Sequence, residues 1–234
     1  MHKDEFLSFV FVSKKREKIN YMHQVIKKSQ NAELLQSMQL DVLLRGYIVL
    51  IYVLWESAFK TLDEYFFEIL KEKKVEELPY NLKNEILCSL LRDIQKKEIK
   101  SFKCMENAKK DFDNLINLEL DKDLKLKEYF QCKTNNPTVD KLKNYLSKFA
   151  FSVQISPKLM KEIEYIVYSR NDIAHSGRCI ENYSEGLKSF LDEISKSFPN
   201  EVQSKNEIDL LQEITLDIYI LFENITNVFE EKYA

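Results

Sequence analysis

The sequence YIVLIYVLWESAFK at residues 47–60 holds the most apolar stretch of the chain, and it decides the class of fold. Its uninterrupted apolar part, residues 47–55, is about half as long as the ~20 residues of a membrane-spanning helix. Arg45 and Glu56 stand at its two sides. We therefore expect a helix buried in a protein core rather than a membrane span.

Glycine and proline are rare in the whole chain, with three glycines and four prolines among 234 residues. Sheet-rich proteins need more of both for their turns. The chain is 44% hydrophobic and 31% charged, as in a globular protein with a sizeable core. We predict an all-α fold.

Helical periodicity and capping signals divide the chain into helices near 14–28, 33–73, 84–95, 139–149, 157–175, 184–198 and 207–231. Residues 96–135 are rich in lysine and acidic side chains, without a long apolar stripe, and we interpret them as an insertion. With no repeat or linker in view, residues 1–234 form a single helical domain in this interpretation.

The net charge of -3 gives no general basic field, so binding of nucleic acid would depend on local lysine clusters. The four cysteines lack metal-ligand spacing, and neither a zinc site nor a disulfide framework is expected. The first residues do not resemble a signal peptide. We expect a cytoplasmic protein without a cofactor or a bound metal.

Ser156 and Pro157 form a start signal for a helix, a capping side chain followed by a residue suited to the first helical position. On that helix one core-facing stripe follows spacings of three and four, namely Leu159, Ile163, Ile166, Val167, Ile173 and Ala174. Arg170 falls within the same stripe. Because a guanidinium stays protonated, it needs an anion, a carboxylate or water there.

Glu56 interrupts the apolar face of the earlier helix in the same way, three residues after Val53 and three before Phe59. Glutamates are rarely buried without a partner. We infer that Glu56 and Arg170 lie near one another, either as a salt bridge or around a shared polar pocket.

His175 follows Asn171 by four residues and Asp172 by three, so both could touch the imidazole and fix its tautomer on a helix. A role as a helix cap or surface residue is the alternative, which Gly177 as a helix terminator supports. Surface placement is expected for His2 and His23.

Arg170 and His175 are separated by ~140° around a regular helix and by ~7.5 Å along it. The two side chains would therefore not grip one phosphate side by side. Either the helix ends before His175, or a second copy of the chain completes the site.

The segment RNDIAH at residues 170–175 resembles the R-x4-6-H motif of the HEPN superfamily, in which asparagine commonly follows the arginine. The stretch LIYVLWESAFK at 50–60 resembles the earlier helix of defence-associated and RiboL-PSP-type HEPN proteins. The resemblance covers about 30–200 and implies an up-and-down helical bundle, here with the 96–135 insertion and extra terminal helices.

The resemblance implies a metal-independent endoribonuclease that acts as a toxin or in antiphage defence. HEPN chains pair as homodimers, or as heterodimers with a related HEPN chain, so that two motifs share one cleft. In that scheme His175 is a general acid or base and Arg170 stabilises charge on the phosphate. Asn171 and Asp172 would support this pair, and Glu56 would hold Arg170 or His175 in place.

Two other functions stay open at this point, a non-catalytic HEPN partner in a toxin–antitoxin or defence system and a nucleotide-binding sensor. In HEPN toxins that a nucleotidyltransferase modifies, a tyrosine stands two residues after the histidine. Gly177 occupies that position here, so neutralisation by that route is not expected. Most aromatic residues fall on apolar stripes, and a platform for stacking bases is not indicated.

Overall fold

The structure of the chain is a computed structural model that describes residues 3–7, 14–31, 37–71, 73–86, 88, 136–175 and 183–233. Its named elements are helices, α1 (Lys3–Leu7), α2 (Lys14–Asn31), α3 (Ser37–Leu70), the 3-10 turn η2 (Val75–Glu77), α6 (Val139–Lys148), α7 (Pro157–His175), α8 (Tyr183–Ser197) and α9 (Glu207–Tyr233). A further helical stretch covers 80–86. The predicted all-α fold is confirmed.

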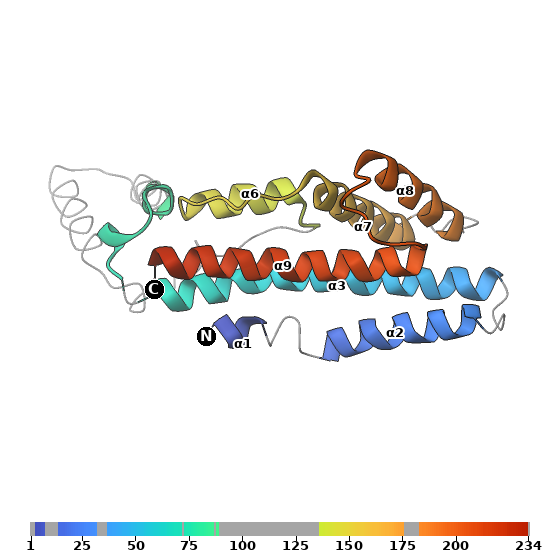
Figure 1. Cartoon of the computed structure of the whole chain (residues 1–234). Coiled ribbons are helices and arrows are strands. Elements are labelled where there is room, and N and C mark those ends of the chain that lie inside the picture. Colours follow the sequence, from blue (N-terminus) through green and yellow to red (C-terminus); the bar gives the residue numbers. More distant parts are fainter. Residues whose placement is uncertain are drawn as a thin grey trace, which may run out of the picture.

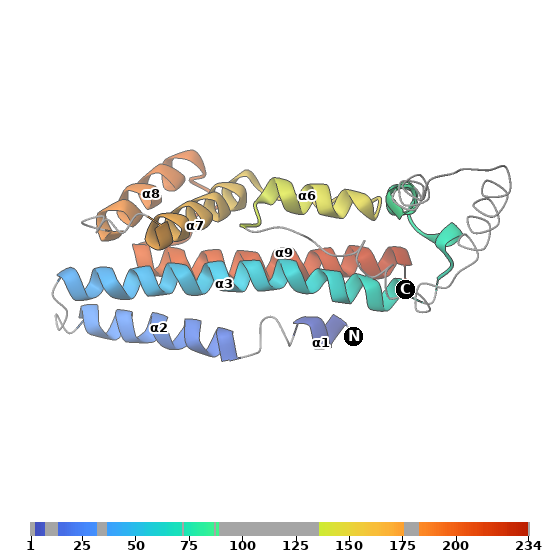
Figure 2. The same cartoon turned by 180° about the vertical axis from the view of Figure 1, so that it is seen from behind.

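Helices α3 and α9 form the long central pair of the bundle (Figure 1). Trp55 of α3 packs on Phe222 of α9 with ring centroids 5.6 Å apart, and Phe66 stacks on Phe229 at 3.8 Å. Because the partners advance together, the two helices run parallel. Helices α1 and α2 cover one side of this pair, and α6, α7 and α8 cover the other, as the opposite view also shows (Figure 2).

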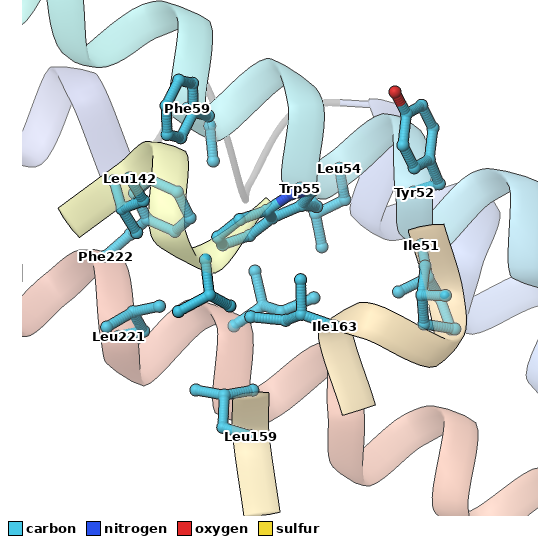
Figure 3. Packing of buried hydrophobic residues seen from close by; sticks show 14 of the residues in the cluster. Ile51, Tyr52, Leu54, Trp55, Phe59, Leu142, Leu159, Ile163, Leu221 and Phe222 are labelled. Atoms are coloured by element: carbon cyan, nitrogen blue, oxygen red, sulfur yellow. The ribbon is translucent and has the colours of Figure 1, made fainter. Parts of the chain in front are cut away.

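Helix α3 is the hub of this arrangement, since α2, α7, α8 and α9 all contact it. Within the described ranges it is the one helix long and apolar enough to cross a membrane. Its apolar residues are used inside the protein instead, with Ile51, Leu54 and Trp55 buried against α6, α7 and α9 (Figure 3). The prediction of a buried helix at 47–55 is confirmed.

The turn before α6 is fastened to α3 by two hydrogen bonds. Tyr52 donates its hydroxyl proton to Asn136 Oδ1 at 3.0 Å, and Trp55 Nε1 donates to the Pro137 carbonyl at 2.8 Å. Asn136 has a φ of 57°, a left-handed conformation that asparagine tolerates better than most residues. This turn brings the first turn of α6, from Thr138 onward, beside α7.

Helix α7 begins where the capping signal predicts. Ser156 Oγ accepts a hydrogen bond from the Leu159 backbone N–H at 3.1 Å, and Pro157 is the first helical residue. Leu159, Ile163, Ile166 and Val167 of the expected stripe are buried. Ala174, in the last turn of α7, is exposed, so the expected stripe is not buried to its end.

His23 is a second correction, since it is only 8% exposed although a surface position was expected. It lies on α2 and packs edge-on against Tyr47 with ring centroids 6.3 Å apart. Burial lowers the pKa of its imidazole, and the nearby Lys27 ammonium lowers it further. Packing against α3 therefore decided the position of a residue that had no partner at motif spacing.

Several expectations fall outside the described residues. They concern the insertion at 96–135, the helix end at Gly177, the surface position of His2, and Cys104, Cys132 and Cys179. Cys88, the cysteine that is described, is exposed and free.

Candidate active site

Arg170 lies between α7 and α3, where an aromatic ring faces its charge. The Arg170 Cζ atom lies 4.7 Å from the centroid of the Tyr52 ring, a cation–π contact. Arg170 Nη1 donates a hydrogen bond to Asn171 Oδ1 at 3.1 Å. A guanidinium has five N–H donors in a fixed fork. These contacts hold the group while leaving it able to bind an oxyanion.

Glu56 lies one helical turn after Tyr52 on α3, and its ion pair is with Lys60, whose Nζ is 2.9 Å from Glu56 Oε1. In the part of the chain that the structure describes, no ion pair joins Glu56 to Arg170. Both groups nevertheless act on the Tyr52 hydroxyl. Burial raises the pKa of Tyr52, the Glu56 carboxylate raises it further, and Arg170 lowers it. The structure thus gives a shared polar surrounding centred on Tyr52, and not a salt bridge.

His175 is the last residue of α7 and is exposed, one turn beyond Asn171. The helix does not end before His175, so that alternative is excluded. The ~140° between Arg170 and His175 on a regular helix therefore applies. One chain brings Arg170 and Asn171 together, and His175 shares the face of Asn171 but not that of Arg170.

Asp172 has a structural partner on α8. The Tyr183 hydroxyl donates to Asp172 Oδ2 at 3.0 Å, and the Tyr183 backbone N–H donates to Asp41 Oδ1 at 2.5 Å. Arg45 donates to the other Asp41 oxygen at 2.8 Å and lies over the Tyr183 ring at 4.6 Å. Burial and the hydrogen bond to Asp172 raise the pKa of Tyr183. This network ties the start of α8 to the end of α7 and to α3.

A second polar group lies near the other end of α7, buried between α7 and α9. Lys158 Nζ is 2.6 Å from Asp217 Oδ2, 2.8 Å from Glu213 Oε1 and 3.1 Å from Glu162 Oε1. The three carboxylates place one oxygen each within 4.8 Å of one another, a spacing that suits a cation. The Lys158 ammonium supplies that positive charge, and Ser204 Oγ donates a hydrogen bond to Glu213.

Glu162 is fully buried, and neither of its oxygens accepts a hydrogen bond of acceptable geometry despite the nearby ammonium. Burial raises the pKa of Glu162 to about 8, because the attraction of Lys158 does not offset desolvation and the repulsion of Asp217 and Glu213. Lys158 shows the opposite balance. Burial lowers its pKa, but the hydrogen bonds to Asp217 and Glu213 outweigh burial and raise it overall.

Two hollows lie on different sides of the bundle. One of about 420 Å³ is lined by α2, α9 and residues 203–205, and it contains none of the sequence-predicted site residues. The other, of about 220 Å³, lies between the start of α6 and α7 and has Asn171 in its wall. Of these two hollows, the smaller adjoins the candidate site through Asn171.

Two features of the site were missed at the level of sequence. Tyr52 was counted as an apolar position, although it stands four residues before Glu56 and so on the same face. Glu162 stands three residues after Leu159 and four before Ile166, within the stripe. The test that singled out Arg170 and Glu56 could therefore have found Glu162. The partners of Lys158 on α9 could not be found in this way.

Comparison with known proteins adds one match. A family model described as HEPN_MAE_28990-like HEPN matches residues 5–233. The match covers every helix that carries the candidate site and extends beyond the region of about 30–200 in which the resemblance was expected. No curated protein and no solved structure matches the chain.

Proposed function

The chain belongs to the HEPN_MAE_28990-like HEPN family, in which ribonuclease-type functions are common, and we propose that it is a metal-independent endoribonuclease. One observation carries the proposal. The guanidinium of Arg170 is held by Tyr52 and Asn171 without an acidic partner among the described residues, at the end of a helix that presents His175 to solvent. A carboxylate paired with Arg170 would have neutralised the charge of its guanidinium. The site instead offers it to an outside phosphate.

The side chains favour cleavage through the ribose 2′-hydroxyl. The imidazole of His175 takes the proton of the 2′-hydroxyl or delivers one to the leaving 5′-oxygen. The 2′-oxygen attacks phosphorus, the bond from phosphorus to the 5′-oxygen breaks, and Arg170 stabilises the charge on the non-bridging oxygens. The products are a 2′,3′-cyclic phosphate and a 5′-hydroxyl. DNA, which lacks the nucleophile, is spared.

The site residues are suited to an anion rather than to a metal. Arg170, Asn171 and His175 offer a guanidinium, an amide and an imidazole, whereas Mg²⁺ prefers several carboxylate or carbonyl oxygens. Asp172 already accepts a hydrogen bond from Tyr183. In our proposal Asp172 fixes the end of α7, and Glu56 shapes the field around Tyr52 and Arg170.

A second copy of the chain completes the site in this proposal. Because Arg170 and His175 leave α7 in different directions, a two-fold axis near the end of the helix would place His175 of one chain beside Arg170 of the other. The partner is an identical chain or a related HEPN chain. An RNA-cleaving dimer of this kind acts in the cytoplasm as a toxin or in antiphage defence, under the control of an antitoxin or another defence protein.

Cleavage of a defined RNA in excess EDTA tests the reaction. We expect the parent protein to cut RNA and leave 2′,3′-cyclic ends, while matched DNA and 2′-O-methyl RNA stay intact. His175→Ala and Arg170→Ala should each lose about 10²- to 10⁴-fold in rate. Lys161→Ala, which removes an exposed cation from the same helix, is the control. Loss of cleavage in EDTA, or full activity of His175→Ala, would reject the mechanism.

Mixing the two inactive variants tests the shared site. If His175 of one chain works with Arg170 of the other, a mixed dimer of His175→Ala and Arg170→Ala contains one intact site, and mixing restores part of the activity. Absence of recovery after proven exchange of subunits would confine the site to one chain. A dimer that binds partners but cuts no RNA would instead favour a non-catalytic HEPN regulator.

A further inference from the structure

One exposed face of α7 carries a row of polar and aromatic side chains that leads to His175. Glu164, Tyr168, Asn171 and His175 follow spacings of four, three and four, so they lie on one face of the helix. Tyr168 is 73% exposed, which is unusual for a large ring in the middle of a helix that is otherwise packed. Tyr168 stands ~10 Å before His175 along the helix axis.

The hollow of about 220 Å³ opens beside this row. Its floor is apolar and buried, formed by Val139, Ile163 and Val167. Tyr168 and Asn171 stand in its wall. The volume is below the ~300–1,000 Å³ of pockets that enclose drug-sized ligands, so the hollow suits one flat ring system rather than a whole metabolite.

Asn171 connects the hollow to the candidate site. Its Oδ1 accepts the hydrogen bond from Arg170 Nη1, and the same side chain borders the hollow. The side-chain amide has two N–H donors besides this oxygen. On a regular helix Tyr168 and Arg170 are ~160° apart, so a ligand with its phosphate on Arg170 reaches Tyr168 only across Asn171, which contacts Arg170 and borders the hollow. A nucleotide of a single strand has this combination of groups.

We propose that the hollow between α6 and α7 binds the base of a nucleotide adjacent to the cleaved phosphate, with the base stacked on Tyr168. This inference rests on the proposed ribonuclease function and specifies its substrate. The base must be unpaired to enter the hollow, so the substrate is single-stranded RNA, a loop or a bulge. The preference of the enzyme for a nucleotide is then set on α7 itself, one to two turns before His175.

Two other polar features within the described ranges do not fit RNA. The larger hollow has Lys205 as well as Asp209 and Glu213 in its lining, so it offers no net positive charge to a phosphate. The Lys158 ammonium is taken up by three carboxylates. The hollow beside Tyr168 has an apolar floor, with Thr138 and Glu164 also in its lining, and adjoins Arg170 through Asn171.

Cleavage kinetics on oligonucleotides that contain one cleavable ribose test the proposal. Tyr168→Ala should lower kcat/KM by about 5- to 150-fold, the loss of one base–aromatic stack, whereas Tyr168→Trp should retain activity. An abasic nucleotide at the position that occupies the hollow should lower kcat/KM of the parent protein by as much as Tyr168→Ala does. In Tyr168→Ala the same abasic substrate should be cut with almost the same kcat/KM as the normal substrate, because the stack is already lost. Tyr21→Ala, which removes a 70% exposed ring from α2, is the control.

Two results would overturn the base-binding proposal. One is a Tyr168→Ala variant that cuts with unchanged rate and unchanged positional preference. The other is dissociation of the dimer by Tyr168→Ala, seen in sedimentation, with activity that returns at high protein concentration. That result would assign the hollow to a second copy of the chain.

Binding separates this inference from the proposed function. A 2′-O-methyl oligonucleotide that carries a fluorescent adenine analogue cannot be cleaved, and stacking on Tyr168 should quench its emission in the parent protein but not in Tyr168→Ala. A parent protein that quenches but never cuts RNA would retain the base site and refute the nuclease. A parent protein that cuts but shows no Tyr168-dependent quenching would retain the nuclease and refute the base site.

Discussion

The two ends of α7 surround a cation in opposite ways. Near the N-terminal end, Lys158 is surrounded by Glu162, Glu213 and Asp217, and the positive charge is cancelled inside the protein. Near the C-terminal end, Arg170 is held by an aromatic ring and an amide. Both cations interrupt the apolar surface of one helix.

The difference follows from what each end packs against. The N-terminal end lies on α9, which supplies two carboxylates. Ser204, which precedes α9, donates a hydrogen bond to one of them. The C-terminal end lies on the part of α3 that carries Tyr52, and Glu56, one turn later on α3, is paired with Lys60. A charge balanced within the fold contributes to structure. A charge left without an acidic partner in the described residues is, in our proposal, the one that binds the substrate.

The largest effect on stability is expected from removing Lys158, the cation at the N-terminal end of α7. Lys158→Met should lower the free energy of unfolding by about 3–5 kcal/mol, because removal of the cation leaves the partly buried carboxylates of Glu213 and Asp217 uncompensated. Urea unfolding measures the change. Lys161→Met, three residues later, removes an exposed ion pair with Glu193 and should cost about 0–1 kcal/mol. Equal losses in the two variants would mean that Lys158 is not buried in the folded protein.

Glu162→Gln should change the pH dependence of stability. Burial raises the pKa of Glu162 from 4.5 to about 8, so the folded state binds a proton that the unfolded state releases. The stability that this proton provides is full below about pH 4.5 and is lost as the pH rises through about 8. The glutamine variant should therefore gain stability relative to the parent between pH 5 and 9. A difference that stays constant over this range would show that Glu162 is charged throughout.

At the C-terminal end of α7, Tyr52→Leu removes the ring that faces Arg170. It should lower the rate of RNA cleavage by about 2- to 30-fold, which corresponds to a cation–π contact of ~0.5–2 kcal/mol. Tyr52→Phe keeps the ring under Arg170 and loses the hydrogen bond to Asn136. Tyr52→Phe should lower the free energy of unfolding by about 1 kcal/mol and should change the rate of cleavage of bound RNA little. If the two variants lose the same activity, the hydroxyl rather than the ring positions Arg170.

The smallest effect is expected from the cap of α7. Ser156→Ala removes the acceptor for the Leu159 N–H and should lower the free energy of unfolding by about 1 kcal/mol. Thermal unfolding compares it with Ser152→Ala, an exposed serine in the preceding segment, for which a change within about 0.5 kcal/mol is expected. The cap lies beside Lys158, at the end of α7 away from Arg170 and His175, so the rate of RNA cleavage should be unchanged. This result would show that the two ends of the helix act independently.

The helices and the motif could be read from the sequence because both depend on local spacing. Ser156 and Pro157 mark the start of α7, and the distribution of Leu159, Ile163 and Ile166 marks its buried face. The anomaly of Arg170 is visible for the same reason. His23 shows the limit of this reasoning, since its burial depends on contact with Tyr47 on another helix.

The family motif and the all-α class are properties of the sequence alone, because composition, helical period and the Arg170–His175 spacing are all local. Tertiary structure decided which charges were balanced. Only the packing of α9 on α7 gave Lys158 its carboxylates, and only the packing of α3 on α7 gave Arg170 an aromatic ring in place of Glu56. Helical periodicity assigns a side chain to a face of its own helix. It cannot tell which residue of a distant helix lies opposite, and that residue decides whether a buried cation is neutralised or kept for a ligand.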